Sequence, residues 1–342
     1  MRATRLILLE GVPGSGKSTT AHFLHRHLAR LGVPHRWWYE GERGHPLYVF
    51  EDAASLNQTV DDIFSQKPER VQRIVGGTLT KWRELAAALE QSGEVALLDG
   101  MLYGHLTWTL FPAGVPNDVT MAYVAEAERA IHPLSPCVIY FRPDDVAGAM
   151  RRIAARRGRE WAERAVRQHT LSPYGRRRGL QGFDGLVAFW EDYRDLADTL
   201  FTRSPLAKCC IPTDAGDWPA YLQRVCAFLG LPAADGAEPR PNSALERFAG
   251  TYDFTHRGER RRCQVTYEGG ALYLTGVPDV WPRTRLIPLE TIDEGGASFA
   301  AESLPFEFTF LEDAARGVRE MRAAGPDFVW GSIPRAFAKR EE

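Results

Sequence analysis

A glycine-rich run near the start of the chain carries residue types that bind polyphosphates. It spans 11–18 with the sequence GVPGSGKS, and a threonine follows. This fits the pattern G-x-x-x-x-G-K-[ST], in which glycines let backbone N–H groups converge on phosphate oxygens. The lysine can reach the β- and γ-phosphates of ATP, and the serine hydroxyl can ligate Mg²⁺. We therefore expect ATP and Mg²⁺ to be bound by Gly11, Gly14, Ser15, Gly16, Lys17, Ser18 and Thr19.

Two carboxylates follow runs that read as strands. Asp99 ends the apolar run VALLD, and Glu40 comes directly after the strand-like residues 35–39. Because the carboxyl ends of parallel strands face the ligand crevice, both side chains are candidate site residues. Asp99 could hold Mg²⁺ together with Ser18 or accept a proton from an acceptor hydroxyl, and Glu40 could do the latter. The sequence leaves the choice between them open.

Arginines are concentrated in one segment. Residues 142–178 hold eleven arginines against four acidic residues, although the net charge of the whole chain is −2. Arg152 and Arg156 stand four residues apart on a predicted helix, and their guanidinium groups could stabilise a transferring phosphoryl group. We predict that they belong to a lid over the phosphates. Arginines 176–178 lie between glycines and are expected to form a mobile basic loop.

Alternating strand and helix patterns in residues 1–232 would position these residues. This alternation predicts a parallel sheet with helices on both faces, the P-loop NTPase arrangement. The expected strands are 5–9, 35–39, 95–98, 137–141 and 208–211. The expected helices are 17–31, 70–91, 119–131, 186–201 and 218–229.

The rest of the chain has a different pattern. Residues 233–244 are rich in Pro, Ala and Gly and are predicted to be a linker. Residues 245–342 contain short strand-like runs, which predict a small antiparallel β domain, either a sheet or a barrel. The expected strands are 251–255, 262–267, 271–275, 284–288, 297–300, 306–311, 318–322 and 328–333.

Composition excludes several classes of protein. The chain has 342 residues, 44% hydrophobic and 25% charged, which is ordinary for a globular protein. No apolar run approaches the roughly 20 residues of a membrane helix, and five sparse cysteines indicate reduced thiols. We expect a cytoplasmic protein with neither a membrane nor a nucleic acid as its partner, and we leave its oligomeric state open.

Several stretches resemble a known family. LEGVPGSGKSTT, LLDG, IYFRPDDVAGAMRRIAARRG and IPTDAGDW resemble segments of thymidylate-kinase-like and deoxynucleoside-kinase-like P-loop kinases, over residues 1–230. The resemblance implies transfer of the γ-phosphoryl group of ATP to a small acceptor, with Mg²⁺ and a closing lid. It also implies that Asp99 and Glu40 face the acceptor. The family's Asp-Arg and Glu-Pro pairs are replaced by Asp99-Gly100 and Glu40-Gly41, both on the acceptor side.

The β part has a fainter likeness. FAGTYDF, GGALYLTG and RLIPLE resemble small β domains of unknown function that are appended to various bacterial enzymes. No catalytic residue follows from this likeness.

The predicted function is that of a P-loop kinase acting on a small molecule, with a nucleoside or a nucleotide among the candidate acceptors. One alternative is an ATP-binding regulatory protein whose β part binds a partner. Another is a nucleic-acid end kinase that holds a strand with its arginines. Four aromatic residues after Asp99 could line an acceptor pocket or serve helix packing: Tyr103, His105, Trp108 and Phe111.

Overall fold

The fold comes from a computed structural model, which describes residues 4–233, 243–278, 280–289, 296–313 and 317–340. The chain divides into two compact units, Met1–Ala234 and Asp235–Glu342. The division falls within the predicted linker 233–244, most of which lies outside the described residues. In that part of the chain which the structure describes, no helix is both long and apolar enough to cross a membrane.

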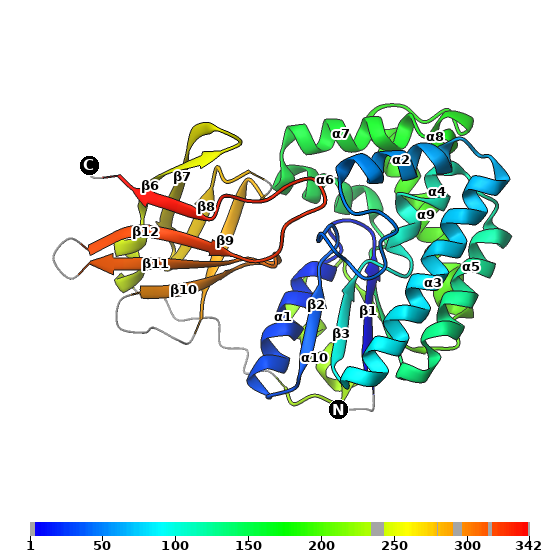
Figure 1. The fold of residues 1–342 in the computed structure, drawn as a ribbon, viewed down its shortest axis with the longest axis horizontal. Helices are drawn as coiled ribbons and strands as arrows, with labels where there is room; N and C mark the ends of the chain where they lie inside the picture. The colour runs from blue at the N-terminus through cyan, green and yellow to red at the C-terminus, as the bar shows by residue number, and fades with distance from the viewer. Residues whose placement is uncertain (1–3, 234–242, 279, 290–295, 314–316, 341–342) are drawn as a thin grey trace. The chain divides into compact units, whose positions relative to one another are not determined.

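A parallel sheet of five strands forms the centre of the first unit within residues 4–233 (Figure 1). Its strand order is β2-β3-β1-β4-β5, and every neighbouring pair is parallel. The central strands are apolar and buried because helices cover both faces of the sheet. The strands are β1 (Leu6–Gly11), β2 (His35–Trp38), β3 (Val95–Asp99), β4 (Cys137–Arg142) and β5 (Ala207–Pro212).

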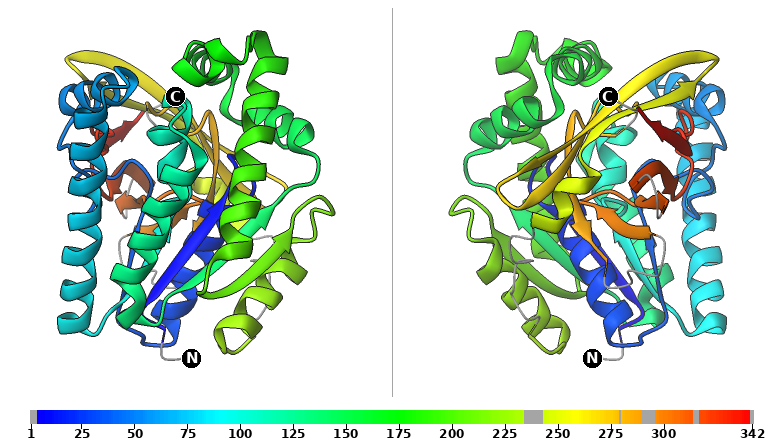
Figure 2. Two further views of the ribbon diagram at one scale, coloured as in Figure 1. Left: turned by 90° about the vertical axis from the view of Figure 1, so that its right-hand side faces the viewer. Right: turned by 90° about the vertical axis from the view of Figure 1, so that its left-hand side faces the viewer.

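Long helices lie on the two faces of this sheet. Helices α1 (Lys17–Arg30) and α10 (Trp218–Leu229) cover one face. Helices α3 (Pro68–Ser92), α5 (Asn117–Ile131) and α9 (Gly182–Arg203) cover the other (Figures 1 and 2). This doubly wound arrangement confirms the predicted α/β fold class.

Shorter helices surround the carboxyl edge of the sheet, and several of them were not predicted. The helix α2 (Ala53–Phe64) begins at a capping box in which Asp52 accepts the backbone N–H of Ser55. The others are α4 (Leu110–Ala113), α6 (Val146–Arg157), α7 (Arg159–Thr170) and α8 (Pro173–Arg177), with a 3₁₀ turn at Gly104–Thr107. A second 3₁₀ turn, His132–Leu134, precedes β4 at the opposite edge of the sheet.

The second unit is a closed antiparallel barrel, so the predicted small antiparallel β domain is confirmed. Among its described residues, consecutive strands pair in chain order, and the last strand pairs with the first. A 3₁₀ turn, Ser243–Phe248, precedes the barrel. The strands are β6 (Gly250–His256), β7 (Glu259–Glu268), β8 (Ala271–Thr275), β9 (Arg283–Pro288), β10 (Gly296–Ala301), β11 (Glu307–Asp313), β12 (Gly317–Ala324) and β13 (Ala336–Lys339).

Aromatic side chains pack the inside of the barrel. The ring of Phe310 lies 4.9 Å from that of Phe248 and 5.3 Å from that of Phe299, and all three side chains are buried. The predicted strand 328–333 is wrong, since that segment forms an isolated bridge between Phe328 and Gly331. The strand that closes the barrel is Ala336–Lys339, further along the chain. It has only four residues, two of them alanine, so the sequence did not indicate a strand there.

Candidate active site at the phosphate loop

The phosphate loop connects the end of β1 to the start of α1. Gly16, the residue before the helix, has φ 103°, a left-handed value that favours glycine. A Cβ at this position would lie 1.9 Å from the Trp218 ring, so that ring packs directly on the loop backbone. Among the described residues, no side chain caps the start of α1 at Gly16, and a helix N-terminus favours the binding of a phosphate group.

Lys17 lies at the mouth of this loop. Its side chain is 9% exposed, and its ammonium group donates hydrogen bonds to the carbonyl oxygens of Gly11 at 2.9 Å and Val12 at 3.2 Å. These bonds hold the cation beside the glycine backbone. A phosphate bound in the loop would lie within reach of the same charge.

Asp99, at the end of β3, is a buried carboxylate. Its side chain is 0% exposed, and neither of its oxygens has a hydrogen-bond partner among the described residues. Burial raises the pKa of Asp99 to about 6, Lys17 acts to lower it and Glu40 acts to raise it. A buried carboxylate without partners is costly, which indicates that a ligand completes its surroundings.

Glu40, two residues after the end of β2, lies at the same edge of the sheet. A Cβ added at Gly100 would lie 3.2 Å from the Lys17 Cε and 3.6 Å from the Glu40 Oε2. Gly100 also has φ +69°. The space beside Asp99 is therefore occupied by Lys17 and Glu40, and glycine is what fits between them. Three residues that the sequence placed far apart thus meet at one edge of the sheet.

The residues at this edge fit a magnesium ion. The Ser18 hydroxyl lies close enough to Asp99 to lower the pKa of that carboxyl, against the larger effect of burial. Among the described residues, no three His, Cys, Asp or Glu side chains gather as a metal cage. One carboxylate and one hydroxyl, completed by phosphate oxygens and water, is the usual way in which Mg²⁺ is held beside a nucleotide.

Glu10, the residue before the phosphate loop, was not recognised in the sequence. Its buried carboxylate accepts the backbone N–H groups of Leu102 at 2.7 Å and Gly104 at 2.9 Å. It therefore ties the loop after Asp99 to the central strand. Burial raises the pKa of Glu10 to about 7, although these hydrogen bonds and the Lys17 charge act to lower it. An acidic residue inside an apolar strand was the signal that could have identified it.

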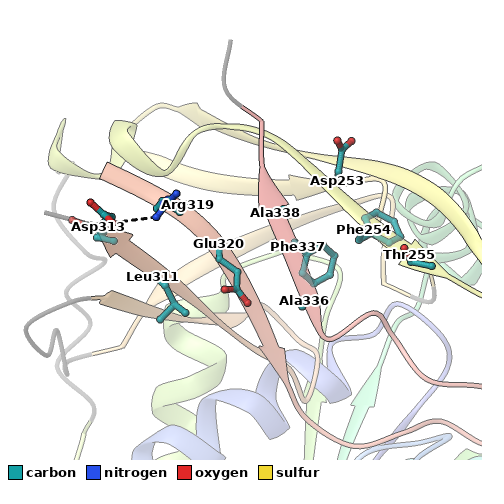
Figure 3. A pocket seen from close by; sticks show the side chains of 11 residues that line it. Asp253, Phe254, Thr255, Leu311, Asp313, Arg319, Glu320, Ala336, Phe337 and Ala338 are labelled. Atoms are coloured by element: carbon teal, nitrogen blue, oxygen red, sulfur yellow. Dashed lines mark hydrogen bonds and ion pairs between the residues drawn. The ribbon is translucent and has the colours of Figure 1, made fainter. Parts of the chain in front are cut away.

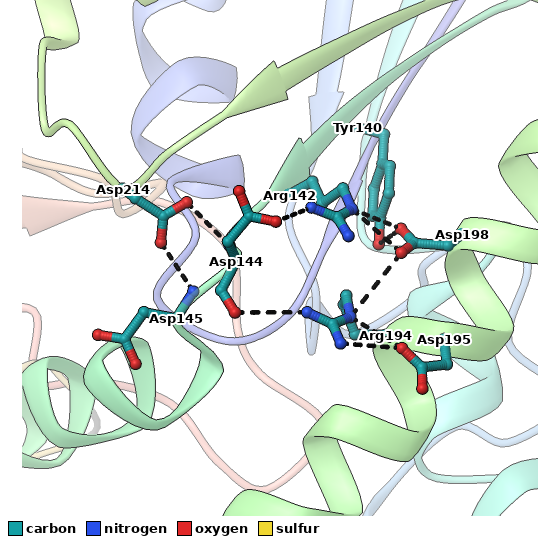
Figure 4. Close-up of polar contacts among 8 residues, drawn as sticks. All are labelled: Tyr140, Arg142, Asp144, Asp145, Arg194, Asp195, Asp198 and Asp214. Atoms are coloured by element: carbon teal, nitrogen blue, oxygen red, sulfur yellow. Dashed lines mark hydrogen bonds and ion pairs between the residues drawn. The ribbon is translucent and has the colours of Figure 1, made fainter.

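Helix α6 brings arginines to the site, and Asp214 fixes where that helix begins (Figure 4). The Asp214 carboxylate accepts the backbone N–H groups of Asp144 at 2.8 Å and Asp145 at 2.9 Å. Arg152 and Arg156 are exposed on α6, so their roles in a lid remain predictions. Among the arginines of α6, Arg157 at the helix end acts on Asp99: burial raises the pKa of that carboxyl, and the charge of Arg157, like that of Lys17, acts to lower it.

A second network fixes the strand that precedes this helix. Arg142, the last residue of β4, donates two 3.0 Å hydrogen bonds to Asp198 of α9. It also forms an ion pair with Asp144. Part of the basic segment is therefore neutralised within the fold.

The predicted mobile basic loop at 176–178 is wrong. Residues Pro173–Arg177 form α8, capped by the Ser172 hydroxyl. Arg177 donates to the Gly114 carbonyl at 2.9 Å, and Arg178 pairs with Asp192 at 3.0 Å. Both side chains therefore form contacts within the fold, and neither belongs to a mobile loop.

The aromatic residues that follow Asp99 divide into two groups. Tyr103 and Phe111 are buried, and the Phe111 ring packs 4.6 Å from that of Tyr174 and 5.0 Å from that of Phe189, which is helix packing. His105 and Trp108 instead face residues from the segment after Glu40. The Trp108 ring lies 4.4 Å from His105 and 5.9 Å from Tyr48.

A pocket of about 620 Å³ lies in the barrel unit (Figure 3). The small residues Ala336 and Ala338 are among its lining residues, with charged side chains from β6, β11 and β12. Several of these charges are paired, as Asp313 is with Arg319 at 3.2 Å and Asp253 with Arg260 at 3.1 Å. Paired surface charges provide no candidate for catalysis.

The chain is similar to some solved structures at low sequence identity. No family model and no curated protein matches the chain. Among solved structures, a thymidylate kinase from Ehrlichia chaffeensis is similar at 12% identity and TM-score 0.36, covering 66% of this chain and 98% of that one. The YorR protein of Bacillus subtilis, solved with phosphorylated GDP, is similar at 15% identity and TM-score 0.33, covering 66% and 94%.

Proposed function

We propose that the chain is an ATP-dependent phosphotransferase that moves the γ-phosphoryl group of ATP to a hydroxyl of a small molecule. The observation that carries this is the convergence of Lys17, Asp99 and Glu40 around Gly100, at the mouth of the phosphate loop. A loop alone would support ATP binding. Carboxylates beside the loop could orient an acceptor hydroxyl and accept its proton.

On this proposal the residues divide between donor and acceptor. Lys17 and the N–H groups at the start of α1 bind the β- and γ-phosphates, and Ser18 and Asp99 are the residues that would hold Mg²⁺. When bound, that ion neutralises charge on the phosphates. Glu40 is exposed and orients the acceptor hydroxyl. Arg152 and Arg156 cover the phosphates and keep water out.

The reaction balances with these groups alone. The acceptor oxygen forms a bond to the γ-phosphorus while the bond between that phosphorus and the β,γ-bridging oxygen breaks. ADP leaves with the electron pair of the broken bond. The hydroxyl proton passes to the Glu40 carboxylate and from there to solvent.

The test is a screen with ATP labelled at the γ-phosphate against nucleosides, nucleoside monophosphates and uncharged cyclic alcohols. Label should move from ATP to an acceptor, and Glu40→Gln should lower that rate about a hundredfold or more while ATP affinity is retained. Glu51→Gln, in the same segment and also exposed, is the matched control and should transfer normally.

Two outcomes would reject the proposal. If ATP binds but label passes to no acceptor, the chain is a nucleotide-binding regulatory protein. If labelled oligonucleotide ends are produced in preference to small molecules, the arginines serve a nucleic-acid strand.

A further inference from the structure

The residue after Glu40 is a glycine with a left-handed backbone. Gly41 has φ 89°, and the Glu42 N–H donates to the Tyr39 carbonyl oxygen at 3.1 Å. Residues 39–42 therefore form a turn with Glu40 second and Gly41 third, and a positive φ at the third position is what a type II turn requires. Proline, which has φ of about −65° and no N–H, could not replace Gly41 in this turn.

Both peptide groups that flank Glu40 are held by hydrogen bonds. The peptide group before it is held by the bond between Tyr39 and Glu42, which lies within the turn. The peptide group after it donates the Gly41 N–H to the Tyr48 hydroxyl oxygen at 2.8 Å. The second bond therefore depends on a side chain seven residues further along the chain.

The ring that carries this hydroxyl is itself fixed by its neighbours. The Tyr48 side chain is 8% exposed, and its ring stacks on that of Phe50 at 4.3 Å and meets that of Trp108 edge to face at 5.9 Å. Trp108 belongs to the segment that follows Asp99. Tyr48 therefore connects the turn that carries Glu40 to the segment after Asp99, and its hydroxyl cannot move away from Gly41 without displacing packed rings.

The Tyr48 hydroxyl acts as a neutral group. Burial raises the pKa of Tyr48 well above its usual value, and the charges of Glu40 and Asp99 act in the same direction. The phenol therefore keeps its proton at neutral pH and is not a candidate base. What it contributes is the hydrogen bond that it accepts, and Gly41 is buried, so the loss of that acceptor would be costly.

We propose that Tyr48 is a positioning residue for phosphoryl transfer: its hydroxyl holds the Gly41 N–H and thereby fixes the Glu40 carboxylate in the direction of the acceptor hydroxyl. This rests on the proposed phosphotransfer and adds a residue to that same site. Without the hydroxyl, the peptide group after Glu40 can rotate, and the carboxylate is less often placed to accept the proton. Transfer then slows, whereas the phosphate loop binds ATP as before.

Tyr48→Phe removes the hydroxyl and keeps the ring. In transfer from labelled ATP this variant should lower kcat about tenfold or more, with the dissociation constant of ATP unchanged. Tyr123→Phe is the matched control, because the Tyr123 hydroxyl is also buried and accepts an N–H, that of Trp82 at 3.2 Å. The control should transfer as wild type does, and equal kcat values in the two variants would overturn the proposal.

A double-mutant cycle separates positioning from general packing. If Tyr48 acts through Glu40, Tyr48→Phe should change kcat by less than about twofold in the Glu40→Gln background, although it costs about tenfold or more when Glu40 is present. The same loss in both backgrounds would show that Tyr48 acts on something other than Glu40, which would also overturn the proposal.

Amide exchange tests the hydrogen bond without relying on activity. The Gly41 N–H of wild type should exchange with deuterium about tenfold or more slowly relative to Tyr48→Phe, as followed by NMR. An unprotected Gly41 amide in wild type overturns the proposal, so this measurement decides even if Tyr48→Phe does not fold.

The failure of the proposed function and that of the positioning role are distinguishable. If wild type moves label to no acceptor, the proposed phosphotransfer fails. If wild type moves label and Tyr48→Phe transfers as fast as Tyr123→Phe, phosphotransfer stands and only the positioning role of Tyr48 fails.

Discussion

At the scale of single residues, Gly100 is required for two reasons that can be tested separately: its left-handed backbone, and the lack of room for a side chain beside Lys17 and Glu40. Gly100 and Gly93 have nearly the same left-handed φ, 69° and 72°, but a Cβ at Gly93 would have nothing within 4 Å. Alanine at either position should lower the free energy of unfolding by about 1 kcal/mol. Gly100→Ala should also slow phosphoryl transfer about tenfold or more, because its methyl group would displace Lys17. Urea unfolding and transfer rates measure both effects, and equal transfer rates in the two variants would refute this role of Gly100.

Glu10 makes stability depend on pH. Its pKa is raised by burial from 4.5 to about 7, so the folded chain binds the proton more tightly than the unfolded chain. The contribution of Glu10 to stability is therefore greatest below pH 4.5, falls as the pH rises to about 7 and is constant above that value.

Glu10→Gln removes this titration. Relative to wild type, the free energy of unfolding of the variant should improve between pH 4.5 and pH 8 by an amount on the order of 3 kcal/mol. Urea unfolding at pH 4.5, 6 and 8 measures the difference, with the exposed Glu94→Gln as control. A difference from wild type that is the same at all three values would show that Glu10 does not titrate in this range.

At the scale of elements, the position of α6 depends on a residue that lies outside it. Asp214 holds the N–H groups of Asp144 and Asp145, and α6 carries the arginines predicted to cover ATP. Asp214→Ala should lower stability by about 1 kcal/mol and raise the KM for ATP several-fold, since α6 loses its anchor. Steady-state kinetics test this against Asp195→Ala, which removes an exposed partner of Arg194. Equal KM values for the two variants would exclude the anchoring role.

The sequence predicted those elements whose local pattern agrees with their tertiary surroundings. Helix α10 has the predicted bounds, Trp218–Leu229, because Asp217 caps its start and Gly230 ends it. Strand β13 (Ala336–Lys339) was missed because closure of the barrel, rather than local preference, makes it a strand. Helices α2 and α7 were missed because few of their side chains are buried: Ile63 in α2, and Ala165, His169 and Thr170 in α7.

The residues of the site, like the helices and strands, were predicted only where a local sequence pattern marks them. Lys17 and Asp99 are found by a motif and by a strand end, which are local signals. Tyr48 and His45 have no local signal, since their significance comes from what the fold places opposite them. Glu10 has a local signal, an acidic residue in an apolar strand, but that signal does not say which groups it binds. Their contacts are with residues distant in the chain or with the backbone of an irregular loop.

At the scale of the whole molecule, two hydrophobic cores predict two unfolding transitions. Phe310 is 0% exposed inside the barrel, and Phe111 is 5% exposed in the first unit. Each change to alanine should destabilise its own unit by about 3–5 kcal/mol and leave the other transition in place. Differential scanning calorimetry of the full chain measures this. If Phe310→Ala shifts both transitions together, the units unfold as one.

The role of the phosphate loop can be measured by calorimetric titration of the chain with ATP and with AMP, both in the presence of magnesium. Wild type should bind ATP far more tightly than AMP, because the loop and Lys17 hold the β- and γ-phosphates. Lys17→Ala should weaken ATP binding about a hundredfold and leave the fold intact, whereas Lys81→Ala, a lysine of α3 paired with Glu84, should bind ATP as wild type does. Equal affinity of wild type for ATP and AMP, or an unchanged affinity in Lys17→Ala, would contradict the assignment of this loop as the triphosphate site.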